Sequence, residues 1–423
     1  MAGTEAVLPG GPRLTDAISV GVLTAQFPLD LVEQVLFETE RLSERQRDLP
    51  AHVMVYYAIA LALYADVSTR EVLRCLLEGV RWLGDPTAAA APAGKSGISQ
   101  ARTRLGAAPL EALYRAVVAP VATAHTPGAW YRGWRVMSLD GTTLDVGDTA
   151  ANRRAFGRPA SSRGANATGA FPQLRVVGLV ETGTHVLCGA QLGAYPTGEV
   201  TLAADVVPSL TREMLCLADR GFLGFDLWHQ AAATGAALVW RAKASQRLPV
   251  LDSYADGSYR SELRWNAHCR HPDRTPIPVR VVAYTLPGVS DAEAAYRLVT
   301  SILEPARAPA AELAALYHER WEIETTFDEF KTQLRGARKV LRSKTPELVR
   351  QEAWGFLLAH FALRALMHEA ALGVTRRTLP HLAALSPSGL AARTSSHPGR
   401  TVRRARQFQS GSRRAPRRET QDE

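Results

Sequence analysis

The stretch YHERWEIETTFDEFK, from Tyr317 to Lys331, holds five carboxylates and two cationic side chains. At about 100° per residue in a helix, Tyr317, Arg320, Glu324 and Lys331 share one narrow stripe. An apolar face lies beside it, so Glu324 is predicted at the boundary between core and solvent. This stripe fits an elongated anionic ligand beside a carboxylate-bound metal ion. The alternative is an exposed Arg320–Glu324 ion pair, worth about 0.3–0.5 kcal/mol.

The remaining carboxylates of this stretch differ in direction. Glu319, Glu322 and Glu329 fall away from the apolar face, and we expect them in water. Asp328 falls close to the stripe and competes with Glu324 for a chemical role.

Two further carboxylates follow predicted strands. Asp140 follows the apolar run VMSL and precedes a glycine, and Asp219 ends MLCLAD. Ligands of open α/β sheets bind beyond the carboxyl ends of strands, where such residues project. Either residue alone would more simply be a turn former, but two in one sheet favour a site. With Glu324 they supply the three carboxylates of a two-metal phosphoryl-transfer site, which takes Mg²⁺ or Mn²⁺.

The elements that must position these residues follow from periodicity. Three antiparallel strands are predicted at 134–146, 174–181 and 185–195, the last two forming a hairpin. A helix at 199–210 precedes a strand–helix–strand unit at 213–219, 225–234 and 237–243, and such a unit implies a parallel strand pair. Together these elements predict a mixed sheet surrounded by helices.

The flanking regions have other patterns. Residues 15–83 and 98–122 have helical periodicity, and this region either lies on DNA or is an accessory bundle. Residues 244–302 are irregular and strand-like, which indicates an insertion. Helix returns near Ala310, and a last long helix is predicted from Thr345 to Gly373.

A basic segment and a basic tail suggest a polyanionic partner. Residues 149–169 are predicted to be a loop that either cradles backbone phosphates or is a solvated surface; it has no acid and four arginines: Arg153, Arg154, Arg158 and Arg163. Residues 393–423 hold nine arginines and three acidic residues, a large share of the net charge of +9. We expect this tail to be disordered and to bind polyanions loosely.

Composition excludes several classes of protein. Four scattered cysteines without CxxC spacing exclude a disulfide framework and a cysteine zinc site. We expect no secretory signal, because the first residues lack a basic segment followed by an apolar one. The longest apolar run, 53–65, is shorter than the about 20 residues that span a bilayer. We therefore expect a cytoplasmic protein in which this run is a buried helix.

Taken together, three sequence motifs resemble the DDE transposases of bacterial insertion sequences, in the group defined by the YREK signature. They are MSLDGTTLDV with Asp140, LADRGF with Asp219, and the Y-(2)-R-(3)-E-(6)-K spacing of Tyr317, Arg320, Glu324 and Lys331. The resemblance covers about 134–373, and residues 15–122 resemble the N-terminal domain of that group.

The resemblance implies an RNase H-like catalytic domain in which Asp140, Asp219 and Glu324 bind two Mg²⁺ or Mn²⁺ ions. It also implies that Tyr317, Arg320 and Lys331 hold DNA near the element end. Some members cleave the second strand through a hairpin and trap a flipped base with a tryptophan of the insertion, for which Trp265 is the candidate in this sequence.

The expected fold is thus α/β, an RNase H-like mixed sheet with flanking helices and a β-rich insertion, preceded by an all-α domain. The expected divisions are 1–125 (helical), 126–243 (first catalytic part), 244–302 (insertion), 303–375 (second catalytic part) and 376–423 (tail).

The expected activity is metal-dependent cleavage at element ends and strand transfer by a nucleoid-associated bacterial transposase. Its partners are double-stranded DNA, namely inverted repeats and target, and a second copy of the chain on DNA ends, with no membrane. The alternatives are a structure-selective RNase H-like nuclease and a non-catalytic DNA-binding derivative.

Overall fold

The computed structural model describes residues 23–43, 49–64, 67–83, 94–159, 171–265, 269, 272–285, 296–318 and 340–383. Met1–Ala370 form one compact unit, and Ala371–Glu423 form a second, of which the structure describes the end of the last helix. Within the described ranges, no helix is long and apolar enough to cross a bilayer.

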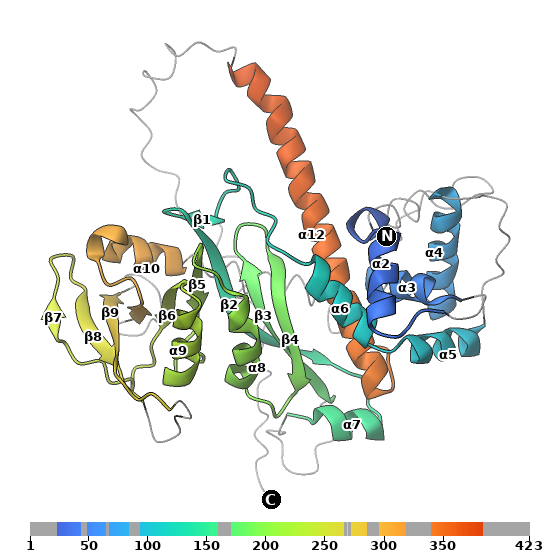
Figure 1. Ribbon diagram of the computed structural model, residues 1–423, viewed down its shortest axis with the longest axis horizontal. Helices are drawn as coiled ribbons and strands as arrows, with labels where there is room; N and C mark the ends of the chain where they lie inside the picture. Colours follow the sequence, from blue (N-terminus) through green and yellow to red (C-terminus); the bar gives the residue numbers. More distant parts are fainter. Residues whose placement is uncertain are drawn as a thin grey trace, which may run out of the picture. The chain divides into compact units, whose positions relative to one another are not determined.

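The described N-terminal region is helical, as predicted. Its helices are α2 (Leu29–Glu38), α3 (Ala51–Leu63), α4 (Thr69–Leu83), α5 (Lys95–Leu105) and α6 (Ala108–Val117) (Figure 1). Every residue of α3 from Met54 to Ala62 is buried, which explains why this apolar run shows no one-sided pattern. The prediction that this run forms a buried helix is confirmed.

A single mixed sheet forms the centre of the first unit (Figure 1), and among the described residues its strand order is β4-β3-β2-β5-β6-β10-β9-β8-β7, with β1 paired to β2. The first strands are β1 (Trp130–Tyr131), β2 (Trp134–Asp145), β3 (Gln173–Glu181), β4 (Val186–Ala194), β5 (Met214–Ala218) and β6 (Ala237–Arg241). β2, β3 and β4 form the predicted antiparallel meander. β5 pairs in parallel with both β2 and β6, so the predicted parallel pair is confirmed.

The strands of the predicted insertion extend the same sheet. They are β7 (Asp252–Ser253), β8 (Tyr259–Leu263), β9 (Ile277–Tyr284) and β10 (Tyr296–Thr300). β10 pairs antiparallel with β6, and β9 and β8 follow it. Arg297 of β10 also donates to the carbonyls of Lys243, Ala244 and Gln246, which fixes the chain where it leaves β6.

Helices cover both faces of the sheet. α8 (Glu199–Val206) and α9 (Phe225–Ala233) pack on one face, in a core with Met137, Leu139 and Trp240. The opposite face is covered by α10 (Ala310–His318) over β5 and β6. On this second face, β3 and β4 instead share a core with α12 (Pro346–Ala383) and the N-terminal helices. The expected α/β architecture, a mixed sheet with flanking helices preceded by a helical N-terminal region, is confirmed.

A buried polar network joins the N-terminal helices to the start of α12. Arg102 of α5 donates to Gln351 at 2.8 Å and to the Ser343 hydroxyl at 2.9 Å. Gln351 returns bonds to the carbonyls of Arg102 and Gly106. The predicted boundary at residue 125 remains a prediction, but the described helices on its N-terminal side share a core with α12. The last helix ends at Ala383, ten residues beyond the predicted end at Gly373, because this exposed glycine continues the helix.

Candidate active site

Asp140 and Asp219 lie side by side on adjacent parallel strands. The last residues paired between β2 and β5 are Leu139 and Ala218, and each aspartate is the residue that follows. Asp219 directly follows β5, as predicted. Asp140 lies inside β2, which continues to Asp145 because it also pairs with β3, so the prediction that Asp140 ends a strand is wrong. Val136 lies four residues before Asp140, and Leu215 and Leu217 lie four and two residues before Asp219; all three face the core that contains α10. Because side chains alternate along a strand, both carboxylates project on the α10 side of the sheet. The structure therefore brings together two of the three predicted catalytic residues.

The two carboxylates have different surroundings. Asp140 is half-buried, and its Oδ1 accepts a hydrogen bond from the backbone N–H of Gly141 at 2.8 Å. Asp219 is 35% exposed, and its Oδ1 is buried without a hydrogen-bond partner in the part of the chain that the structure describes. A buried carboxylate oxygen without a donor is costly unless a cation satisfies it. This oxygen fits a metal ligand.

Arg241 is a third charged residue in the same row. It ends β6, and the pairing of Ala218 with Trp240 places it next to Asp219 on the same face. Its Nη1 lies 3.9 Å from Asp219 Oδ1, too long for a hydrogen bond, and its guanidinium lies 4.7 Å from the ring centre of Tyr296. Sequence reasoning missed Arg241, which lies two residues before the end of the predicted strand 237–243 but is the last residue of β6.

Tyr317 connects α10 to the end of β5. Its side chain is 6% exposed and packs in the core with Leu313 and Leu217. Its hydroxyl donates a hydrogen bond to the carbonyl of Ala218, the residue before Asp219, at 3.2 Å. Tyr317 thus fixes α10 beside the two aspartates, and its contact with DNA stays a prediction.

The other residues of the predicted stripe lie outside the described residues. These are Glu324, Arg320 and Lys331, together with the competitor Asp328. Within the described residues, no group of three or more His, Cys, Asp or Glu side chains is placed to hold a metal ion. The two neighbouring aspartates would therefore need a ligand from another part of the chain.

The basic segment after β2 begins as a helix, α7 (Ala150–Phe156), and the prediction of a loop is wrong for these residues. Thr149 accepts a hydrogen bond from the backbone N–H of Asn152, so it caps this helix. Arg153 and Arg158 both pair with Asp148, and hydrogen bonds from these arginines lower the pKa of the Asp148 carboxyl.

The four arginines of this segment are therefore not equivalent. Arg153 and Arg158 share the charge of one carboxylate. Arg154 is exposed, and Arg163 lies outside the described residues. Phosphate binding by this segment stays a prediction.

Trp265, the candidate for a base-trapping residue, follows β8. It is 38% exposed, and its ring meets Phe225 of α9 edge-on at 6.3 Å. A role in holding a base stays a prediction.

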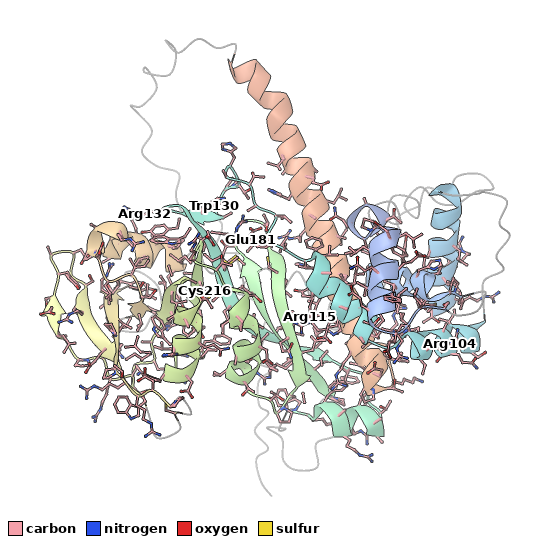
Figure 2. All side chains as sticks on the ribbon, in the orientation of Figure 1. Arg104, Arg115, Trp130, Arg132, Glu181 and Cys216 are labelled. Carbon is pink, nitrogen blue, oxygen red and sulfur yellow. The ribbon has the colours of Figure 1, made fainter. Side chains whose placement is uncertain are left out.

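Two thiols of the sheet are poor nucleophiles. Cys216 of β5, labelled in Figure 2, is fully buried, and burial raises its pKa to about 12. Burial also raises the pKa of Cys188. Neither cysteine is a thiolate near neutral pH, so the carboxylates are the better candidates for the chemistry of this site.

Two family descriptions match the chain. "Insertion element 4 transposase N-terminal" matches residues 17–115, and "Transposase DDE domain" matches residues 132–362. The second match covers more than half of the chain and contains Asp140, Asp219 and Glu324.

Two proteins of Escherichia coli K12 are similar in sequence. The transposase InsG for insertion sequence element IS4 is 28% identical over 345 residues, covering 80% of this chain and 74% of that protein. The putative transposase InsZ is 26% identical over 216 residues, covering 49% and 66% respectively. Among solved structures, a piggyBac transposase synaptic complex with hairpin DNA has a TM-score of 0.44 and 11% identity, covering 86% of this chain and 78% of that chain.

Proposed function

This chain belongs to the DDE transposases, and from that premise we propose that it cuts DNA at the ends of its element and joins those ends to target DNA. The observation that supports this most directly is the pair of neighbouring aspartates, Asp140 within β2 and Asp219 just after β5, on the α10 side of the sheet. Asp219 Oδ1 is buried and has no hydrogen-bond donor among the described residues, and these properties suit an oxygen that binds a metal ion.

The residues present fit divalent metal ions. Asp140 and Asp219 would hold them from adjacent strands, and we propose Glu324, which follows α10 in the sequence, as the third carboxylate. Oxygen ligands of this kind suit Mg²⁺ or Mn²⁺. When bound, two such ions would activate the attacking hydroxyl and stabilise the leaving oxygen of a phosphodiester.

The chain's own residues would orient the DNA. We assign Arg320 and Lys331 to backbone phosphates at the element end, because a guanidinium and an ammonium on the stripe of Glu324 suit that ligand. We also assign Tyr317 to the element end. To contact DNA, its hydroxyl would have to give up its hydrogen bond to the Ala218 carbonyl. Exposed Arg154 and the neighbouring arginines of the segment after β2 would add phosphate contacts.

The proposed reaction proceeds without a covalent enzyme intermediate. Water attacks the phosphodiester at the element end, and the freed 3′-hydroxyl later attacks target DNA. Joining both element ends to one target needs the two ends held together, so we propose that the active form is a homodimer on double-stranded DNA. Trp265 is proposed to act only if a hairpin forms on the second strand.

The test is an assay with purified protein, Mg²⁺ and DNA carrying the terminal repeats of the element. Asp140→Asn, Asp219→Asn and Glu324→Gln should each bind ends but lower cleavage by at least about a thousandfold, a barrier increase of about 4 kcal/mol. Glu322→Gln is the matched control, since it removes a carboxylate from the predicted solvent side of the same stretch, and it should cut normally.

The possible outcomes separate the candidate functions. Cleavage retained by Glu324→Gln and lost in Asp328→Asn would move the third carboxylate to Asp328. Cutting of branched DNA without joined products would favour a structure-selective nuclease. End binding by the wild-type protein without any cutting would favour a non-catalytic derivative.

A further inference from the structure

One carboxylate of the insertion caps the helix that carries Tyr317. Asp256 lies in the turn between β7 and β8, and its Oδ2 accepts a hydrogen bond from the backbone N–H of Ala310 at 3.0 Å. Its Oδ1 accepts bonds from the N–H and hydroxyl of Ser258, at 3.1 and 2.5 Å. The first N–H groups of a helix have no partner within the helix, so Asp256 supplies one for α10 from another part of the chain.

A buried arginine of the insertion holds the segment that leads to α10. Arg280 of β9 is 0% exposed, and its guanidinium donates to the carbonyls of Ile302 and Ala308. Its Nη2 lies 3.9 Å from Asp256 Oδ2. Burial would raise the pKa of Asp256, but bonds from Ser258 and Ala310 and the charge of Arg280 hold it below its usual range. The carboxylate is therefore ionised at neutral pH and balances the buried cation.

The β1–β2 turn holds the same helix through an exposed contact. Arg132, labelled beside α10 in Figure 2, donates to both carboxylate oxygens of Glu312 at 2.8 and 2.7 Å. These two side chains are 42% and 44% exposed, so solvent screens the pair. The contact of the insertion differs, because its cation is buried and its carboxylate binds the helix backbone itself.

We propose that Asp256 and Arg280 are positioning residues for the catalytic site. They fix where α10 begins, and α10 holds Tyr317 against the carbonyl that precedes Asp219. Ala310 and Tyr317 are two turns apart, about 10 Å along a rigid helix, so a shift at one end moves the other. The insertion thereby fixes the position of Tyr317 beside Asp219, on the helix that precedes Glu324 in the sequence. This inference rests on the proposed function.

The test compares Asp256→Asn with Asp252→Asn in the full-length protein. Asp252 lies in the same hairpin, is exposed and pairs with Arg260 across β7 and β8, so it is a matched control. Hydrogen exchange of residues 310–318 should become at least about tenfold faster in Asp256→Asn and stay unchanged in the control. The Mg²⁺ concentration for half-maximal cleavage should rise at least about fivefold in Asp256→Asn, with DNA-end affinity within about twofold of wild type.

A second variant, Ser258→Ala, should have a smaller effect than Asp256→Asn. Ser258→Ala removes one donor from Asp256 but leaves the bond to Ala310, so its exchange rate and Mg²⁺ requirement should lie between those of wild type and Asp256→Asn. It also keeps the inference testable if Asp256→Asn fails to fold.

Two results would overturn the positioning role. One is unchanged exchange of α10 in Asp256→Asn, and the other is faster exchange with a wild-type Mg²⁺ requirement. A wild-type protein that never cuts its element ends would instead overturn the proposed function. The exchange measurement would still decide whether Asp256 holds α10.

Discussion

The Tyr317 hydroxyl donates a hydrogen bond to the carbonyl of Ala218 at 3.2 Å, one residue before Asp219. This bond joins the helix over the sheet to the strand end that carries a candidate metal ligand. It also shows that a residue predicted on a DNA-facing stripe is 6% exposed in the DNA-free protein. The position of α10 and the geometry of the strand end are therefore linked.

Tyr317→Phe should keep the packing of the ring but lose this bond. We expect the free energy of unfolding to fall by about 1 kcal/mol, the usual contribution of such a hydrogen bond. Tyr317→Ala should cost about 3–5 kcal/mol, because it also leaves a cavity in the core with Leu313. Denaturant unfolding of both variants measures the difference. Wild-type stability of Tyr317→Phe combined with weaker DNA-end binding would show that the hydroxyl serves DNA instead.

Arg241→Gln should tighten divalent metal binding in the absence of DNA. Its guanidinium lies 3.9 Å from Asp219 Oδ1 and competes electrostatically with a metal cation for that carboxylate. Both groups are partly exposed, so we expect a modest gain of about three- to tenfold in Mn²⁺ affinity. Arg241→Lys keeps the charge and should bind Mn²⁺ as wild type does. Calorimetric titration with Mn²⁺ measures both, and equal affinities in all three proteins would contradict the competition.

Gly355→Ala should separate α12 from α3. A Cβ at this position would lie 2.4 Å from the carbonyl oxygen of Ala58, and this backbone atom cannot move aside easily. We expect a loss of about 1–3 kcal/mol in unfolding free energy, the usual range for overpacking. Gly373→Ala is the control, since none of the described residues lies within 4 Å of its added methyl and alanine favours the helix by about 1 kcal/mol. Opposite signs in denaturant unfolding are the expected result.

His360 should make the protein less stable as the pH falls. It is 4% exposed on α12, and burial, with the charges of Arg364 and His185, lowers its pKa to about 3. Below about pH 6.5 the unfolded chain binds a proton at this residue that the folded protein does not, so stability falls by about 1.4 kcal/mol per pH unit until the folded pKa is reached.

Denaturant midpoints at pH 7.5 and 5.5 measure this slope. His360→Leu should reduce the loss between these two values by about 1.4 kcal/mol, whatever its effect at pH 7.5. His125→Gln, at an exposed position, should keep the wild-type slope. The same slope in all three proteins would assign the acid sensitivity to other groups.

The sequence predicted the parts of the site that depend on local pattern. The apolar run before Asp219 identified the end of β5, although the run before Asp140 did not mark the end of β2, which continues along β3. The strand–helix–strand unit implied that β5 and β6 are parallel. The strand end and the parallel pairing could be predicted because both depend on local pattern: the two-residue period of a strand and a short connection between strands.

Other features depend on contacts between distant residues, which periodicity does not contain. The helical period placed Tyr317 at the edge of the apolar face but could not show that β5 covers it. Asp148 lies just outside the acid-free segment that it neutralises, and Thr149 caps a helix where a composition rich in small residues suggested a loop. The capping of α10 by Asp256 joins residues 54 positions apart.

The pairing of β10 with β6 has a consequence for how this family member can be shortened. Removal of the insertion would leave the backbone N–H and C=O groups of β6 along an open edge, beside the strand end that holds Arg241. Such edges recruit strands from other molecules, so a chain trimmed there is expected to aggregate before its catalysis can be measured. The hairpin of β7 and β8, at the far end of the strand order, is where length can vary without opening the centre of the sheet.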